Sequence, residues 1–340
     1  MPKHWPNDWA PKPNISLTSM KVFDECERKW VYYSLPYEIK NEVGFGIRAE
    51  KSLMPWEAFA GQVVDDVLRD ALRDYILNQE WPDDLPERAK AIWKDYSKWS
   101  IELRKTTANH KLSKFGDLNA IDRIYFGEPI DDDQKERLRS VVRTSLEKFE
   151  KSGIKDFITS YPTENWRLTK PITEEPIPWF RHGDVPVYAS YDFAIEDGTQ
   201  AIIFDWKTGK KNQWSLERVK EQLHGYAAFA IDVWKISPAN ITLIPFFMGE
   251  GTEWESWPVD LHYLANMQVR WKTRYDDLVN RTRKCGDNIR NWEKMFPLAE
   301  NFEKACPRCQ FRSCAGYGRL AGMEKDVVNE LVPEEEAYYE

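Results

Sequence analysis

Three charged side chains could together carry out metal-dependent hydrolysis: Asp192, Asp205 and Lys207. Carboxylate oxygens suit Mg²⁺ and Mn²⁺, and an amine beside such an ion can position or polarise a water molecule. Asp205 and Lys207 are two residues apart, so on a strand they point to the same face. The alternative is a surface hairpin with an ordinary ion pair. The apolar run 202–204 before Asp205 indicates a buried strand instead, and charges at its end need partners.

A β-hairpin must bring these side chains together. The Asp-Gly pair at 197–198 predicts a turn between the run 202–204 and a strand at 185–192, which ends in Asp192. Hydrophobic periodicity predicts the other core elements: a helix at 56–77, a strand at 166–168, a helix at 214–234 and a strand at 241–247. The order helix, three strands, helix, strand predicts an α/β fold with a central sheet flanked by helices.

Five cysteines, an odd number, favour metal ligation over a disulfide framework. Cys306, Cys309 and Cys314 form a C-x-x-C-x4-C pattern that lacks a fourth ligand, and no second C-x-x-C lies nearby as a zinc ribbon would require. Cys26 and Cys285 are the candidates. Cys26 lies on the apolar stripe of a helix predicted at 18–34 and is expected to point inward. The alternative to a ligand role is that Cys26 is simply a small buried hydrophobic residue. Cys285 lies among charged residues.

These patterns together resemble the PD-(D/E)xK nuclease superfamily and, within it, the RecB-like branch. Gln222 and Tyr226 match the Q-x-x-x-Y element on the helix that follows the catalytic lysine, and their spacing places both on one helical face. Residues 15–20 and 26–33 resemble the opening helix of that branch. The resemblance implies that Asp192 and Asp205 bind Mg²⁺ or Mn²⁺, that the Trp206 carbonyl adds a ligand, and that Lys207 holds the attacking water.

Asp65 marks a departure from the family pattern. Residues 61–68 resemble the G-x-x-x-H-x-x-L helix of the branch, but Asp65 stands where histidine is usual. A carboxylate there can also ligate magnesium, and the apolar neighbours Val64, Val67 and Leu68 favour that role. The alternative is a solvated acidic pair, Asp65-Asp66.

For the cysteines, the resemblance selects Cys26 as the fourth ligand, because AddB-type nucleases take one cysteine from before the domain and three from after it. Four thiolates suit a [4Fe–4S] cluster, which would join the segment 300–316 to Cys26 and clasp the two ends of the domain. Zinc in the same four thiolates is the alternative.

The predicted organisation is an arm at 1–14, a nuclease domain at 15–320 with a charged helical insertion at 79–160, and an acidic tail at 321–340. The net charge of −8 argues against a protein that coats nucleic acid non-specifically. The chain shows no apolar stretch long enough to span a membrane and no signal peptide, which predicts a cytoplasmic protein.

The expected activity is that of a metal-dependent deoxyribonuclease, with exonuclease action on DNA that has single-stranded character. The expected settings are DNA repair, CRISPR adaptation or phage-related DNA processing, with a helicase or another DNA-processing protein as a partner. The alternative is a catalytically weak nuclease-fold module that holds DNA or such a partner without cutting. The complete set of Asp192, Asp205, Lys207 and Gln222 favours the enzyme.

Overall fold

The computed structural model describes most of the chain, namely residues 13, 15–35, 42–108, 120–168, 179–285, 289–301, 305–306 and 309–314. The predicted acidic tail and, apart from Pro13, the predicted arm lie outside the described residues. The boundaries predicted for the nuclease domain and its insertion stay predictions.

The described part of the chain contains a central sheet of five strands in the order β3-β6-β7-β8-β9. They are β3 (Trp166–Arg167), β6 (Phe193–Glu196), β7 (Ala201–Lys207), β8 (Ile241–Phe247) and β9 (Trp257–Pro258). The β7–β8 pair is parallel and the other pairs are antiparallel, so the sheet is mixed. Parallel neighbours need a crossover connection, which α9 (Gln213–Phe229) and the π-helical turn η3 (Ala230–Trp234) supply.

Strand β7 is buried on both faces, which explains its continuous apolar sequence. Ala201 and Ile203 pack into the core that contains α9. Ile202, Phe204 and Trp206 pack into a second core. Helices therefore cover both faces of the sheet, and the strand ends where Lys207 becomes partly exposed.

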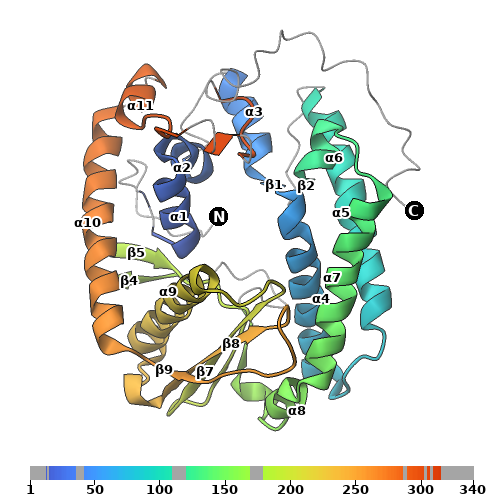
Figure 1. The fold of residues 1–340 in the computed structure, drawn as a ribbon. Coiled ribbons are helices and arrows are strands. Elements are labelled where there is room, and N and C mark those ends of the chain that lie inside the picture. Colours follow the sequence, from blue (N-terminus) through green and yellow to red (C-terminus); the bar gives the residue numbers. More distant parts are fainter. Residues whose placement is uncertain are drawn as a thin grey trace.

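One face of the sheet is covered by three long helices that stand side by side in Figure 1: α4 (Trp56–Asn78), α5 (Leu85–Ala108) and α7 (Asp132–Lys151). Asp131 caps α7 through a capping box with Gln134. Gly153 follows the helix with a φ of +73°, a conformation that glycine adopts without strain. The shorter helices α6 (Asp122–Phe126) and α8 (Ile154–Thr159) and the parallel pair β1 (Leu53–Met54) and β2 (Ala120–Ile121) complete this side.

The other face packs against α9 and α10 (Leu261–Cys285). The N-terminal helices α1 (Leu17–Glu25) and α2 (Glu27–Ser34), α3 (Glu42–Lys51), α11 (Ile289–Met295) and the hairpin of β4 (Trp179–His182) with β5 (Val185–Tyr188) also belong to this part of the molecule (Figure 1). Searching the described helices for one long and apolar enough to cross a membrane finds none.

The strand predicted at 185–192 is wrong in its partner. Residues Val185–Tyr188 pair with β4, and the partner of β7 across the 197–198 turn is the following segment, β6. A second tight turn at Gly183, with a φ of +62°, lies directly before Val185 and folds β5 back onto β4. Each turn pairs the two strands that flank it: the turn at Gly183 joins β4 and β5, and the turn at 197–198 joins β6 and β7.

Two helices predicted as continuous are divided. The helix expected at 18–34 breaks at Cys26, whose backbone is extended between α1 and α2. The helix expected to run from 261 to 292 forms α10 and α11 as separate elements. On η3, Val233 was expected to face inward but is 44% exposed, because the π-helical turn changes the direction in which side chains point.

Candidate active site

Asp192, Asp205 and Lys207 meet where the β6–β7 hairpin ends. Phe193 pairs with Phe204, so Asp192, directly before β6, lies beside Asp205. The Lys207 ammonium is 2.6 Å from Oδ2 of Asp205. Asp192 Oδ2 accepts a hydrogen bond of 2.9 Å from the backbone N–H of Trp206. The two carboxylates and the amine therefore come together as the sequence predicted.

Asp205 is a buried carboxylate with an incomplete set of partners. Its exposed fraction is 0%. Oδ2 pairs with the Lys207 ammonium, whereas Oδ1 has no hydrogen-bond partner among the described residues. A buried carboxylate oxygen without a partner is costly. The donor set of two carboxylates with such an unsatisfied oxygen fits a hard divalent cation.

Burial, more than repulsion, perturbs the protonation of the two carboxylates. Burial, followed by the charge of Asp205, raises the pKa of Asp192 well above its ordinary range. Burial also raises the pKa of Asp205, and the Lys207 ammonium opposes that rise. Burial alone would lower the pKa of Lys207, but the charges of Asp205 and Asp192 raise it, so its amine keeps a proton. This concentration of negative charge attracts a cation.

Helix α4 brings Asp65 to the same place. Oδ1 of Asp65 lies 3.4 Å from the indole Nε1 of Trp206, and its charge raises the pKa of both Asp192 and Asp205. Its other oxygen pairs with Arg69 on the next helical turn.

The acidic pair on α4 is not solvated as the alternative interpretation expected. Asp66 is bound by Arg69 at 2.6 Å and by the hydroxyl of Tyr96 at 2.7 Å. Arg69 was not identified from the sequence, although its spacing of four and three residues from Asp65 and Asp66 is that of helical ion pairs. No three His, Cys, Asp or Glu side chains in the described residues are placed to hold a metal ion together. Arg69 holds Oδ2 of Asp65, so a ligand role for Asp65 would fall to Oδ1, the oxygen that faces Trp206.

Helix α9 contributes Gln222 and Tyr226, as expected. The amide Nε2 of Gln222 donates to the Tyr226 hydroxyl at 2.9 Å, and Tyr226 is 3% exposed. Burial and then the charges of Asp205 and Asp192 raise the pKa of Tyr226 well above its usual range, so its hydroxyl stays protonated beside the carboxylates. The ligand role predicted for the Trp206 carbonyl stays a prediction.

Arg218 is a neighbour of the site that sequence reasoning missed. It lies one helical turn before Gln222, and its charge lowers the pKa of Asp205. The signal was present in the sequence, because 218, 222 and 226 are successive four-residue steps on one helix.

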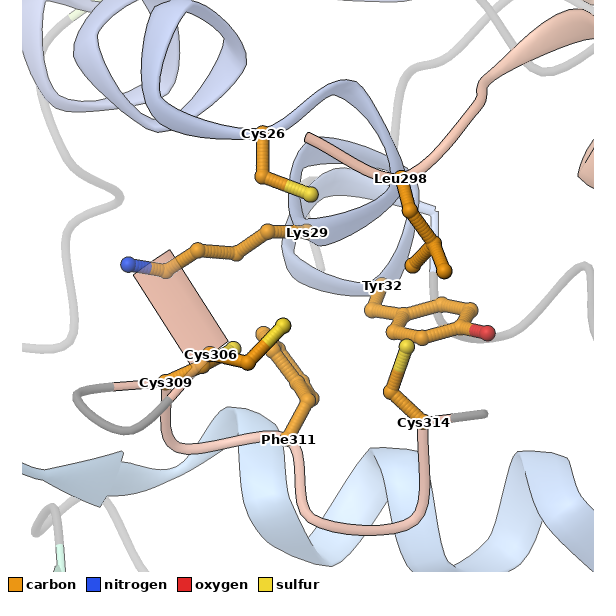
Figure 2. Close-up of a pocket in the computed structure, with 8 residues that line it drawn as sticks. All are labelled: Cys26, Lys29, Tyr32, Leu298, Cys306, Cys309, Phe311 and Cys314. Atoms are coloured by element: carbon orange, nitrogen blue, oxygen red, sulfur yellow. The ribbon is translucent and has the colours of Figure 1, made fainter. Parts of the chain in front are cut away.

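Away from this site, four of the five cysteines line one pocket. Figure 2 shows Cys26 at the junction of α1 and α2, across from Cys306, Cys309 and Cys314 of the C-terminal segment. The remainder of the lining consists of Lys29, Tyr32, Leu298 and Phe311. Burial raises the pKa of Cys309 to about 12. Burial, then Cys314 and Cys26, raises that of Cys306.

Cys285 lies elsewhere, and its surroundings differ from those expected. It is 0% exposed and packs in the core, and its thiol donates to the Arg281 carbonyl with an S···O distance of 3.2 Å. Cys26, expected to point into the core, is only partly buried. The expected contrast in burial was therefore wrong, while the predicted grouping of Cys26 with the three late cysteines agrees with the shared pocket.

The C-terminal cysteine segment is fastened to α3. Both the backbone N–H and the hydroxyl of Ser313 donate to Oε1 of Glu50 at 2.9 Å. Gln310 Nε2 donates to the carbonyls of Glu50 and Lys51 at 3.1 and 3.2 Å. Glu50 is 4% exposed, and burial raises its pKa to about 7. The C-terminal end of the described chain is thereby held to α3.

Comparison with known proteins agrees with this geometry. No curated protein and no solved structure matches the chain at a significant level. The family model described as the PD-(D/E)XK nuclease superfamily matches residues 14–314, which include the hairpin site, α9 and all five cysteines. Membership indicates hydrolysis of phosphodiester bonds in a nucleic acid. The chain belongs to the PD-(D/E)XK nuclease superfamily.

Proposed function

We propose that the protein is a Mg²⁺- or Mn²⁺-dependent deoxyribonuclease of the RecB-like branch, with exonuclease action on DNA that has single-stranded ends. The observation that carries this proposal is the buried Asp205 carboxylate: its Oδ2 pairs with Lys207, and its Oδ1 has no hydrogen-bond partner in the described part of the chain. Such a carboxylate gains most from a bound divalent cation.

The roles follow from where each side chain lies. Asp192 and Asp205 would hold the ion, with Asp65 and the Trp206 carbonyl as further ligands. When bound, the ion supplies Lewis-acid polarisation of the phosphoryl oxygen and a more acidic water.

Lys207 keeps its proton, so it acts as a hydrogen-bond donor that holds the attacking water and not as a base. Gln222 and Tyr226 form a hydrogen-bonded pair at the wall of the site and would orient the water or the substrate strand. Most of the rate acceleration in this arrangement would come from positioning of the reacting groups and from electrostatic stabilisation of the transition state.

Cleavage of end-labelled single- and double-stranded DNA with Mg²⁺ or Mn²⁺ tests the proposal. We expect Asp205→Asn and Lys207→Ala to slow cleavage by roughly 10²–10³-fold or more while DNA binding stays close to that of the wild type. Asp132→Asn is the matched control, because the Asp132 side chain is 98% exposed at the far end of α7. Full activity in both site variants would refute the assignment.

One observation favours the second candidate, a DNA-holding module with weak catalysis. Asp65 is engaged by Arg69, and a site held in this way opposes metal binding. Wild-type protein that binds DNA with no cleavage under either metal would decide for this module.

We also propose that Cys26, Cys306, Cys309 and Cys314 bind a [4Fe–4S] cluster. The support is that four thiols from opposite ends of the domain line one pocket, although they are not placed to share a single metal ion. A cluster of several irons is larger than one ion, so its ligating sulfurs stand farther apart. The binding free energy of such a centre is part of the folding free energy.

Anaerobic purification with iron, sulfide and zinc analysis tests the cluster. We expect the wild-type protein to be brown. The Cys26→Ser variant should lose the colour and become sensitive to protease at both ends of the domain. Cys285→Ser is the control, because Cys285 lies outside the pocket, and it should stay brown. Colourless protein with stoichiometric zinc would decide for the zinc alternative.

A further inference from the structure

Trp214, in the first turn of α9, is exposed in an unusual way. It is 63% exposed and is the one aromatic side chain among the large exposed hydrophobics of the described residues. Indole rings normally bury most of their area. An exposed tryptophan on a helix that leads into an active site is therefore a candidate contact for a bound ligand.

Two cations lie close to this ring. The guanidinium of Arg218 is 4.5 Å from the ring centroid, and the ammonium of Lys21, on α1, is 5.8 Å from it. Arg218 also acts electrostatically on Asp205. The same arginine thus links the exposed ring to the carboxylate at the centre of the site.

The local charge has the opposite sign to that of the whole chain. The protein carries a net charge of −8, whereas residues 207–220 contain five basic residues and one acidic residue. Lys207, Lys211 and Lys220 pair with carboxylates. The attraction for a polyanionic strand at the beginning of α9 therefore comes from Lys210 and Arg218.

Spacing along α9 connects the ring with the site. Trp214, Arg218, Gln222 and Tyr226 follow at four-residue steps, and at ~1.5 Å per residue the distance from the first to the last is about 18 Å along the axis. At ~3.4 Å per nucleotide, the rise of a stacked strand, this corresponds to at most roughly five nucleotides, and to fewer in an extended strand. A strand with its scissile phosphate at Asp205 could extend along the helix to the indole.

We propose that Trp214, with Arg218 and Lys21 beside it, is a base-stacking platform for single-stranded DNA a few nucleotides from the bond that is cut. The inference rests on the proposed function and specifies its substrate as a strand with unpaired, unstacked bases. Aromatic side chains combined with cations that follow the backbone are the usual means of sequence-independent single-strand binding.

Binding of fluorescent oligonucleotides without divalent metal tests the platform independently of cleavage. We expect Trp214→Ala to weaken binding of a single-stranded oligonucleotide about 5- to 150-fold and Trp214→Phe to restore most of it. Duplex binding should change little, because paired bases cannot stack on the ring. In cleavage assays the KM for single-stranded DNA should rise with little change in kcat.

Val269→Ala is the matched control. Val269 is 66% exposed but lies on α10, and its truncation should leave both affinities unchanged. Unchanged single-strand affinity in Trp214→Ala, or an equal loss for single strands and duplexes, would overturn the platform. If the wild type cuts no DNA but Trp214→Ala still loses single-strand affinity selectively, the platform stands and the proposed nuclease activity fails.

Discussion

Glu50→Gln should remove a large pH dependence from the stability of this protein. Glu50 is 4% exposed and accepts hydrogen bonds from the Ser313 N–H and hydroxyl. Burial raises its pKa from an ordinary 4.5 to about 7, against smaller opposing effects of Ser313 and Arg312. Between these two values the folded state binds more protons than the unfolded state. The free energy of unfolding therefore falls as the pH rises through this window.

The magnitude follows from the two pKa values. At ~1.4 kcal/mol for each unit of the pKa difference, the full effect is about 3.5 kcal/mol, of which most is lost between pH 5 and pH 8. This stabilisation is complete below pH 4.5 and absent above pH 7. Glutamine does not titrate, so the variant lacks this contribution. At pH 8 the variant should be as stable as the wild type or more stable, and at pH 5 the wild type should have the advantage.

Urea-induced unfolding of both proteins at several pH values measures the effect. The difference between wild type and Glu50→Gln should change by about 2–3 kcal/mol between pH 5 and pH 8. Glu102→Gln, at an exposed position on α5, is the control and should keep the wild-type profile. Parallel pH profiles for wild type and Glu50→Gln would refute the reasoning, because they would show that Glu50 is already ionised at pH 5 in the folded protein.

Three further changes test the site. Asp65→Ala should lower activity and the affinity for Mn²⁺ by at least the roughly 10- to 100-fold that loss of an outer metal partner costs. An unchanged metal titration would show that Asp65 has no part in metal binding. Gln222→Ala removes the hydrogen bond to Tyr226 and should lower kcat/KM about fivefold, for a bond worth ~1 kcal/mol, with metal affinity unchanged; equal losses of both would count against an orienting role. In Gly249→Ala the new Cβ would lie 2.3 Å from the Gly209 carbonyl oxygen, so the loop after Lys207 must shift and activity should fall, with circular dichroism as the check that the fold persists.

Local pattern predicted the elements that carry the site. The apolar run before Asp205 gave a buried strand, and the period of two residues placed Lys207 on the face of Asp205, where the ion pair is found. The four-residue spacing of Gln222 and Tyr226 likewise predicted that they share a helical face, and there they are hydrogen-bonded. These inferences succeed because they depend on neighbours within one strand or one helix.

The prediction for Cys285 was wrong because it relied on the charge of nearby residues. Its immediate neighbours are basic, yet it continues the buried stripe of α10 that includes Trp271, Leu278 and Thr282. The three- and four-residue steps of this stripe were readable in the sequence. Helical period, and not the charge of adjacent residues, determines which side a side chain takes.

Sequence pattern by itself predicted which residues could form the site and most of the strands and helices around it, and the family resemblance grouped Cys26 with the cysteines that share its pocket. Only the tertiary structure decided which segment pairs with β7, because two turns compete for residues 185–196 and their pairing energies depend on partners far along the chain. Only the tertiary structure decided that Asp65 faces Trp206 and that Glu50 is buried against Ser313. Burial and electrostatics at these positions arise from contacts between distant segments, and no local spacing encodes them.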